Sequence, residues 1–460
     1  MRIVTNPGQR ALYTTLSHKW GDSEPLKLTT TNMTDMHREI PYDTVPRTFL
    51  DAIWLTRQLG IDYIWIDSLC IIQDDPDDWR SESVKMRDVY GNSYLNIAAS
   101  HATDSSGGLF TSTDMPQKYP AYSIPSKPNH FVRPQPYLDH TDFGSTYANY
   151  ERRWQLLSRG WVLQERLLAP RVVYFDADEL KWECMKTADC QCGAIVSMWN
   201  FKVDYSGSVF RSEIPLSFGW MRIAEQFSIL TLTYDTDRAV ALSGIARQAL
   251  LSGRGGRYLA GVWEQDLALQ LCWEIDTECR KPETYIAPSW SWLSIFGSVR
   301  NFNRMENHMQ GCQIDVEITD VQVKTVAGTD ETGRGESGYL KLNGRCVEMS
   351  ATLLAGESWP HPPRYGLVTR NGEEFDGYVE MDYLMSDDDA ERITEVLVLY
   401  WGYMEPWRDN FLVLKPVEGQ EGTYERLGTF WYETYDDDYE RTEFDRVIGW
   451  CDERRDITII

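Results

Sequence analysis

Apolar and polar positions alternate with two different periods along the first 200 residues of the 460-residue chain. Four short apolar runs predict β-strands: residues 12–17, 63–66, 94–99 and 171–175. The unbroken apolar character of the run 63–66 is typical of a strand that is covered on both faces.

Between these runs, apolar side chains recur at helical spacing. Three helices are predicted: one from near Thr44 to Gly60, one from Asp78 as N-cap to Tyr90, and one over residues 156–168. Strands that alternate with helices favour a parallel sheet with right-handed crossovers. We therefore expect an α/β domain over residues 1–200. The stretch from Ser100 to Trp154 lacks periodicity and is interpreted as a long surface insertion.

The pattern changes twice more along the chain. Residues 209–300 favour helices, and from about residue 310 the apolar and polar positions alternate as in strands. We therefore predict three regions, with boundaries at 1–200, 201–305 and 306–460: an α/β domain, a mainly helical region and a β-rich region.

The charge balance narrows the range of partners. The chain has 70 acidic against 45 basic residues, which gives a net charge of −25. This excess disfavours general nucleic-acid binding and docking on anionic membranes, but it leaves room for a local basic pocket. There is no run of about 18 apolar residues, so no membrane span is expected.

The cysteines indicate a reduced protein. There are nine of them, spread over the chain, and the N-terminus has no apolar signal region, so we expect free thiols and a cytoplasmic location. Cys184, Cys190 and Cys192 form a cluster. Its spacing lacks the paired C-x2-C pattern of structural zinc sites, and no histidine follows closely, so no metal site is predicted.

Chemically versatile residues stand at the ends of the first two predicted strands. Residues 17–21 (Ser-His-Lys-Trp-Gly) follow the first strand, and residues 67–70 (Asp-Ser-Leu-Cys) follow the second. Because ligands of open α/β sheets bind outside the carboxyl ends of the strands, the two segments are expected to share one pocket. Taken singly, each residue also has a structural interpretation: His18 as a satisfied core histidine, Asp67 as a turn cap, and Cys70 as a small buried hydrophobe.

A second group of candidates lies on the predicted helix over residues 156–168. Trp161 and Glu165 are four residues apart and share one helix face. A solvated glutamate on an amphipathic helix would look the same. A glutamate beside an indole in a partly dry cleft could instead stabilise a cationic transition state. No glycine-rich dinucleotide or P-loop fingerprint accompanies these residues, which disfavours a dehydrogenase or an NTPase.

At these segments the sequence resembles the fungal heterokaryon-incompatibility (HET) domain family. The resemblance covers residues 10–185 and rests on segments that follow one another in order: residues 16–21, 63–73, 78–79, 86–90, 96–100, 108–110 and 159–166. Weaker similarity continues through residues 241–246, 260–263 and 287–292. The resemblance implies a role in non-self recognition and regulated cell death, with a protein partner that the sequence does not identify.

HET domains in turn look like remote relatives of TIR domains, some of which cleave NAD. This implies a TIR-like, flavodoxin-like parallel sheet with a long insertion, and assembly into a homo-oligomer on activation. The segment from Arg159 to Glu165 resembles the TIR segment Arg-Trp-Cys-x-x-Glu that carries the catalytic glutamate, with Gly160 as one extra residue.

The likeness therefore implies Glu165 as the catalytic residue, with NAD as substrate and no bound cofactor. The residues expected to bind the substrate are Ser17, His18, Trp20, Gly21, Asp67, Cys70, Arg159 and Trp161. The basic side chains expected around this pocket are His18, Lys19, Arg159 and Arg166.

Two other functions stay open. The chain could be a non-enzymatic signalling module that acts through assembly. It could also be a cysteine hydrolase in which Cys70 is the nucleophile, His18 the base and Asp67 the orienting carboxylate, since these residue types suit nucleophilic catalysis.

Overall fold

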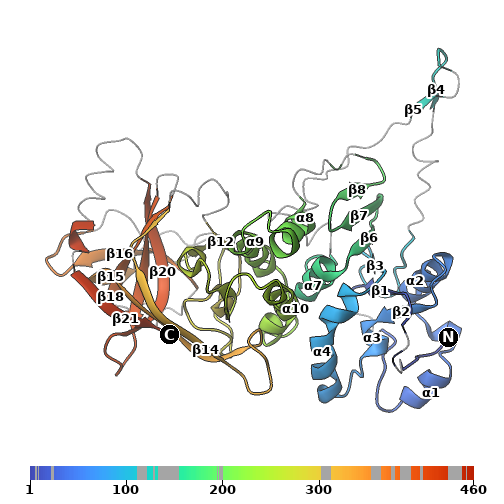
Figure 1. The fold of residues 1–460 in the computed structure, drawn as a ribbon, viewed down its shortest axis with the longest axis horizontal. Helices are drawn as coiled ribbons and strands as arrows, with labels where there is room; N and C mark the ends of the chain where they lie inside the picture. The colour runs from blue at the N-terminus through green and yellow to red at the C-terminus, as the bar shows by residue number, and fades with distance from the viewer. Residues whose placement is uncertain are drawn as a thin grey trace. The chain divides into compact units, whose positions relative to one another are not determined.

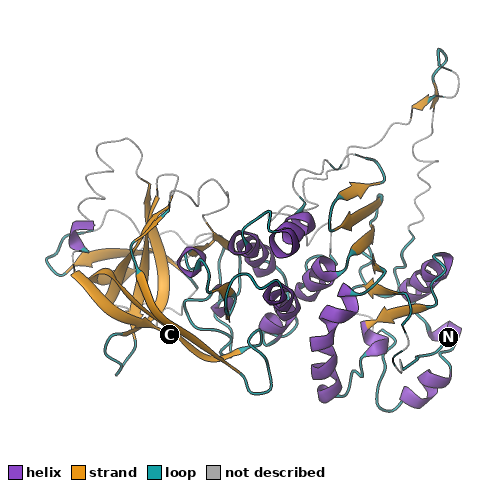
Figure 2. Ribbon diagram, viewed as in Figure 1, coloured by secondary structure: helices purple, strands orange, loops and turns teal. Residues whose placement is uncertain are grey.

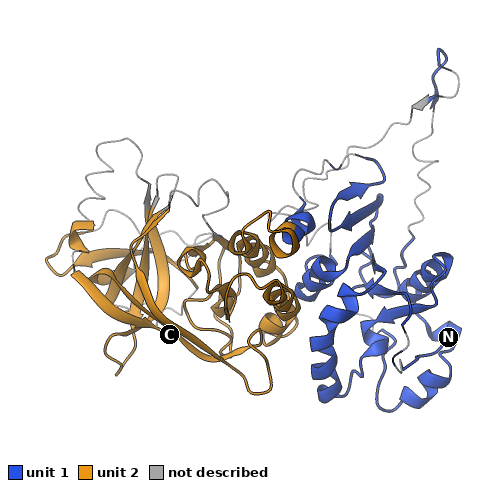
Figure 3. Cartoon of the chain, in the orientation of Figure 1, with its two compact units in different colours: residues 1–206 blue, residues 207–460 orange. Residues whose placement is uncertain are grey.

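The structure is a computed structural model. The residues that it describes are 1–5, 8, 10–21, 25–110, 122–127, 130–132, 155–193, 195, 200–301, 312–353, 364–374, 379–383, 395–404, 408–433, 448–451 and 453–460. The chain divides into two compact units, residues 1–206 and 207–460 (Figure 3). Most of the predicted insertion, residues 111–121 and 133–154, lies outside the described residues.

The first unit is built on a six-stranded sheet with the order β2-β1-β3-β6-β7-β8 (Figure 1). Its strands are β1 (Tyr13–Ser17), β2 (Tyr63–Ile66), β3 (Leu95–Ala98), β6 (Arg171–Phe175), β7 (Leu180–Cys184) and β8 (Ala188–Cys190). The first four in spatial order are parallel, and β7 and β8 are antiparallel additions. This confirms the α/β prediction, and the order 2-1-3 places the topological switch point between β1 and β3.

The helices of the first unit follow the predicted order. They are α1 (Met33–Arg38), α2 (Arg47–Gln58), α3 (Asp67–Cys70), α4 (Pro76–Gly91), α7 (Gly160–Leu168) and α8 (Phe201–Ser206), with a 3-10 turn η1 (Tyr42–Thr44) and a short hairpin of β4 (Tyr122–Ser123) and β5 (Phe131–Val132). Gly60 follows α2 with a φ of 71°, as expected for a residue just past a helix end.

Two predicted helix starts were wrong. The N-cap of α4 is Asp75, whose carboxylate accepts hydrogen bonds from the backbone of Asp77 and Asp78, and Pro76 occupies the first helical position. Asp78 instead accepts the backbone N–H of Ile72 at 2.8 Å. The last predicted helix begins at Gly160 and not at residue 156, because residues 155–158 form turns.

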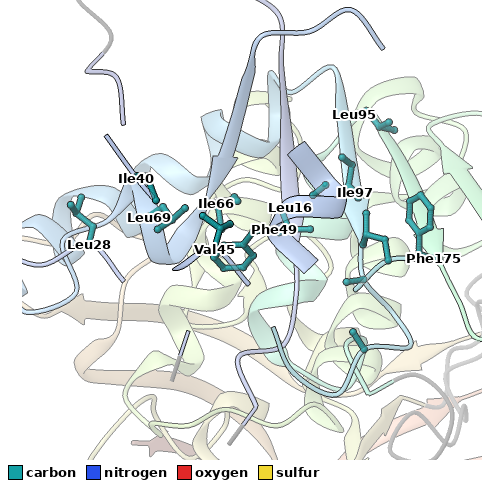
Figure 4. Packing of buried hydrophobic residues seen from close by; sticks show 14 of the residues in the cluster. Leu16, Leu28, Ile40, Val45, Phe49, Ile66, Leu69, Leu95, Ile97 and Phe175 are labelled. Atoms are coloured by element: carbon teal, nitrogen blue, oxygen red, sulfur yellow. The ribbon is translucent and has the colours of Figure 1, made fainter. Parts of the chain in front are cut away.

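The alternation along β1 determines which helices cover each face of the sheet. Thr14 is hydrogen-bonded to Thr56 of α2 at 2.7 Å, and Leu16 packs with Phe49 of α2 in the apolar core of this face (Figure 4). On the other face, the Tyr13 hydroxyl donates to the carbonyl of Val89 in α4 at 2.7 Å. Ser17 has the same parity as Tyr13, so it lies on the α4 side of the sheet.

The second unit begins with helices and continues with strands (Figure 2). It contains a π-helical turn η2 (Gly207–Arg211), α9 (Leu216–Ser228), α10 (Asp237–Leu251), α11 (Leu267–Gln270) and a 3-10 turn η3 (Trp292–Ser294). Short antiparallel pairs accompany them: β9 (Tyr258–Leu259) with β10 (Val262–Trp263), and β11 (Trp273–Ile275) with β12 (Val299–Asn301). The expected helical region is therefore helical mainly up to residue 251.

The β-rich prediction for the last region is confirmed. The strands found among its described residues are β13 (Gln313–Ile314), β14 (Glu317–Thr325), β15 (Gly335–Leu353), β16 (Arg364–Thr369), β17 (Val379–Met381), β18 (Glu395–Met404), β19 (Arg408–Pro416), β20 (Thr423–Glu433) and β21 (Glu453–Ile459). The pairings close on themselves, because β18 pairs with both β19 and β15. Buried side chains such as Tyr365, Val398 and Phe411 share one apolar cluster. Among the helices of the described residues, we find none with the length and apolar character needed to cross a membrane.

Candidate functional site

The carboxyl end of β1 meets a glutamate of α7. Ser17 and Glu165 are 1% and 7% exposed, and the Ser17 hydroxyl donates a hydrogen bond to Glu165 Oε2. Asn96 of β3 supports the serine, because its Nδ2 donates to Ser17 Oγ at 2.9 Å. The contact joins residues 148 positions apart in the sequence, next to the switch point of the sheet.

Tyr90 of α4 completes this buried cluster. Its hydroxyl takes part in hydrogen bonding with Ser17 and Glu165, and burial near Glu165 raises its pKa well above the ordinary value. Its ring lies edge-on to Trp65 of β2, with centroids 5.6 Å apart. Tyr90 and Asn96 were both missed as site residues by sequence reasoning. Tyr90 fits the apolar period of its helix, whereas Asn96 carries a signal that could have been used: it is the only polar residue of an otherwise apolar buried strand.

Burial makes Glu165 an unusual carboxylic acid. It raises the pKa from 4.5 to about 7, and the charge of Asp67 acts in the same direction. The hydrogen bond from Ser17, the charge of Arg159 and the hydrogen bond from Tyr90 oppose this increase. Glu165 therefore titrates close to neutral pH, the range in which a carboxyl group can act both as acid and as base.

Asp67 connects the second strand end to the loop after β1. Its Oδ2 accepts the indole N–H of Trp20 at 3.1 Å, and its Oδ1 lies 3.8 Å from His18 Nδ1. The same Oδ1 accepts the backbone N–H of Ser68 at 2.7 Å at the start of α3. Asp67 thus has both roles: it caps the turn at Ser68, and it contacts the predicted site residues Trp20 and His18.

His18 is a buried and neutral imidazole. It is 3% exposed, its ring lies edge-on to Phe49 with centroids 4.9 Å apart, and neither ring nitrogen has a hydrogen-bond partner among the described residues. Burial lowers its pKa, the charge of Arg159 adds to this, and Asp67 opposes it. The Arg159 guanidinium also donates to the backbone carbonyl of His18 at 2.8 Å, which ties the start of α7 to the end of β1.

Trp161 and Glu165 both contact α4, as expected for residues on one helix face. The half-buried indole of Trp161 lies edge-on to Trp79, with ring centroids 6.2 Å apart, while Glu165 contacts Tyr90. Gly21 has a structural requirement of its own. Its φ is 68°, and a Cβ built on it would lie 2.3 Å from the Cβ of Asp104, so the close approach of these two loops needs glycine.

The cysteine-hydrolase arrangement does not form. Burial raises the pKa of the Cys70 thiol to about 12, so the thiol is protonated at neutral pH and is a poor nucleophile. The unpartnered ring nitrogens of His18 make no hydrogen bond to Cys70. The base that this chemistry requires is therefore not positioned.

Two of the basic residues expected at the pocket have partners of their own. Lys19 donates to the amide oxygen of Gln155 at 3.3 Å. Arg166 forms a buried ion pair with Glu183 of β7, with Nε 2.9 Å from a carboxylate oxygen, and Tyr174 donates to the same carboxylate at 2.6 Å. Arg166 lies one position after Glu165 on α7 and is committed to this pair, so its assignment to the pocket was wrong.

The cluster around Glu165 contains a carboxyl group with a pKa of about 7, hydroxyl and amide donors, and aromatic rings. This set can stabilise a positive charge that develops next to the carboxylate. Among the described residues, the group whose donor atoms lie close enough together to bind a metal is elsewhere: Glu179, Cys190 and Cys192 on the β7–β8 hairpin.

Comparison with known proteins identifies the segment that carries this site. No curated protein and no solved structure matches the chain. The family model described as heterokaryon incompatibility protein (HET) matches residues 13–165, from the first residue of β1 to Glu165. A HET domain implies a role in heterokaryon incompatibility. Residues 13–165 of this chain are a HET domain, which confirms the resemblance that the sequence motifs carry.

Proposed function

We propose that this protein is an effector of fungal non-self recognition that triggers regulated cell death, and that its first unit acts by cleaving NAD. Glu165 is the proposed catalytic residue. The observation that carries the proposal is the buried contact between Ser17 and Glu165. It places a carboxyl group with a pKa of about 7 at the carboxyl ends of the strands, where α/β folds bind their ligands.

Cleavage of NAD requires few catalytic groups from the protein. In NAD the bond between ribose C1′ and the nicotinamide nitrogen breaks, and its electron pair goes to the nitrogen, so the neutral nicotinamide leaves without a general acid. The ribose becomes oxocarbenium-like, water attacks C1′, and the proton that this water gives up passes to the solvent. A carboxylate next to the ribose stabilises this cation, as in glycoside hydrolysis. Ionised Glu165 fits this task.

Neighbouring groups suit the rest of the substrate. Arg159 is half-buried and close enough to Glu165 to affect its pKa, so we assign the pyrophosphate to its guanidinium, beside the hydrogen bond that it donates to the carbonyl of His18. Trp20 and Trp161 would supply aromatic surface, and Ser17 and Asp67 would contact the ribose. The likeness of the segment 159–165 to the TIR catalytic segment supports the same assignment.

Access to Glu165 would depend on a change of state. The carboxyl group is 7% exposed and is hydrogen-bonded by Ser17, so a substrate would have to displace that hydroxyl. We propose that assembly into a homo-oligomer on activation opens the contact, in response to a protein partner.

The test is release of nicotinamide from NAD by the full-length chain, measured before and after enforced oligomerisation. Wild type should release nicotinamide and Glu165→Gln should not. Glu39→Gln is the matched control, because Glu39 is an exposed glutamate of the same unit. Wild-type protein that releases no nicotinamide in any oligomeric state would refute the proposed activity.

A non-enzymatic signalling module is the second candidate. The same burial of Glu165 favours it, since a carboxyl group hydrogen-bonded to Ser17 and Tyr90 also serves as a structural tie between β1, α4 and α7. Cell death that persists with Glu165→Gln while cellular NAD stays constant would support this candidate over the enzyme.

A further inference from the structure

Strands β7 and β8 form a hairpin at one edge of the first sheet (Figure 1). Three potential metal ligands lie close together on it. Glu179 immediately precedes β7, Cys190 is the last residue of β8, and Cys192 lies in the turn that follows. One donor atom from each side chain lies within 4.8 Å of the others. Glu179 and Cys190 are buried, at 6% and 8% exposed, and Cys192 is half-buried.

Backbone hydrogen bonds hold this arrangement in place. The N–H of Gln191 donates to the carbonyl of Leu180 at 2.9 Å, and the N–H of Gly193 donates to that of Cys190 at 2.9 Å, which folds the turn back over the start of β7. Gly193 has a φ of 71°, a conformation that glycine adopts without strain. The two sulfurs are thereby brought to 3.2 Å from each other.

We infer that Glu179, Cys190 and Cys192 form a zinc-binding site. Two thiolates and one carboxylate are a donor set that a borderline-soft, tetrahedral cation accepts, and hard cations such as Mg²⁺ do not select thiolates. Two sulfurs bound to one zinc ion at about 2.3 Å lie roughly 3.8 Å apart in a tetrahedron, so binding requires the thiols to separate by only about half an ångström. The fourth position is left for water or a further ligand.

Backbone N–H groups that contact the potential ligands favour the same assignment. The N–H of Cys192 donates to Glu179 Oε2 at 3.0 Å, which orients the carboxylate toward the two thiols. The N–H of Ile195 approaches Cys190 Sγ at 3.4 Å, a contact that stabilises a thiolate.

The third potential ligand does not come from the cysteine cluster of the sequence. Cys190 pairs with Lys181 across the hairpin, so Cys184 lies three residues farther along β7, roughly 10 Å away. The third ligand is instead Glu179, eleven positions before Cys190. A zinc ion here would fasten the antiparallel edge of the six-stranded sheet, independently of any activity at Glu165.

Metal titration of the full chain tests the site. The protein is reduced, stripped with a chelator, and titrated with Co²⁺ and then Zn²⁺. We expect one Co²⁺ per chain with a thiolate charge-transfer band, displacement of Co²⁺ by Zn²⁺, and a higher melting temperature with zinc. Cys192→Ser and Cys190→Ser should abolish the band, and Glu179→Gln should weaken affinity about 10- to 100-fold. Cys184→Ser is the matched control and should bind as wild type does.

Three results would overturn the inference. The first is a reduced wild-type protein that shows no saturable Co²⁺ or Zn²⁺ binding. The second is a charge-transfer band that survives both Cys190→Ser and Cys192→Ser. The third is a band that Cys184→Ser removes as completely as the other two variants do. Because the wild-type titration needs no variant, a folding defect in a mutant leaves the first result decisive.

Discussion

Glu165→Gln should stabilise the first unit, and it should do so only at neutral and higher pH. Raising the pKa of a carboxyl group from 4.5 to about 7 corresponds to about 3 kcal/mol of preference for its neutral form. Below pH 4.5 the folded and unfolded states both hold the proton. Between pH 4.5 and 7 only the folded state keeps it, so the free energy of unfolding of wild type falls as the pH rises. Above pH 7 both states are ionised and the penalty is complete.

The glutamine variant lacks this penalty but keeps an amide oxygen that can accept the Ser17 hydroxyl. Its free energy of unfolding should therefore equal that of wild type near pH 4.5 and exceed it by up to about 3 kcal/mol at pH 8. The assay is urea unfolding with pulse proteolysis at a series of pH values, with fragments from residues 1–206 identified by mass spectrometry. Glu39→Gln, which changes an exposed glutamate, should follow the wild-type curve.

Ser17→Ala supplies an independent check. The hydrogen bond from Ser17 lowers the pKa of Glu165, so its removal should move the fall in stability to higher pH. The reasoning fails if the stability curves of wild type and Glu165→Gln run parallel from pH 4 to 9, because Glu165 would then titrate with the same pKa in both states.

Four further changes have defined outcomes. If NAD is cleaved, kcat/KM should rise with pH through about 7 as Glu165 of the free protein ionises, measured as nicotinamide release at low NAD concentration. Glu183→Gln should cost about 3–5 kcal/mol by urea unfolding, because it leaves the buried guanidinium of Arg166 without its counter-charge. Gly21→Ala should cost about 1–3 kcal/mol, since its positive φ and tight packing both oppose a side chain. Arg238→Met should change the melting temperature of the second unit little, because the buried guanidinium has no hydrogen-bond partner among the described residues, and its cation–π contact with Phe296, at 4.4 Å from the ring centroid, offsets part of the cost of burial.

The sheet of the first unit was predictable because its strands are short, apolar and bounded by turns. The predicted runs 63–66 and 171–175 coincide with β2 and β6, the run 12–17 begins one residue before β1, and the run 94–99 exceeds β3 by one residue at each end. Helix starts were harder, since the apolar period of a helix continues into flanking turns. The side-chain hydrogen bonds of Asp75 and the position of Pro76 identify the first residue of α4.

The candidate site was predictable in its residue types and not in its partners. Strand ends marked Ser17 and Asp67, and helical spacing marked Glu165, but the contact between Ser17 and Glu165 spans 148 positions and depends on how α7 packs. The ring of Tyr90 packs in the core, and its hydroxyl is hydrogen-bonded to Glu165. The helical period of apolar residues predicts the packing of the ring but not the hydrogen bond. The assignment of Arg166 failed for the same reason, because the buried partner Glu183 lies on a strand that follows in the sequence.

Stability and the proposed activity favour opposite protonation states of Glu165. The folded unit favours the neutral, hydrogen-bonded carboxyl group, whereas stabilising a ribosyl cation requires the ionised one. A cation next to Glu165 would lower its pKa, so a cationic nicotinamide ring bound beside it would favour ionisation of this residue and of no distant glutamate. The cost of about 3 kcal/mol for ionising Glu165 in the folded unit is therefore reduced when the nicotinamide ring lies beside it. A merely structural carboxyl group would show no such coupling, so a pKa of Glu165 that is the same with and without NAD would argue for the non-enzymatic role.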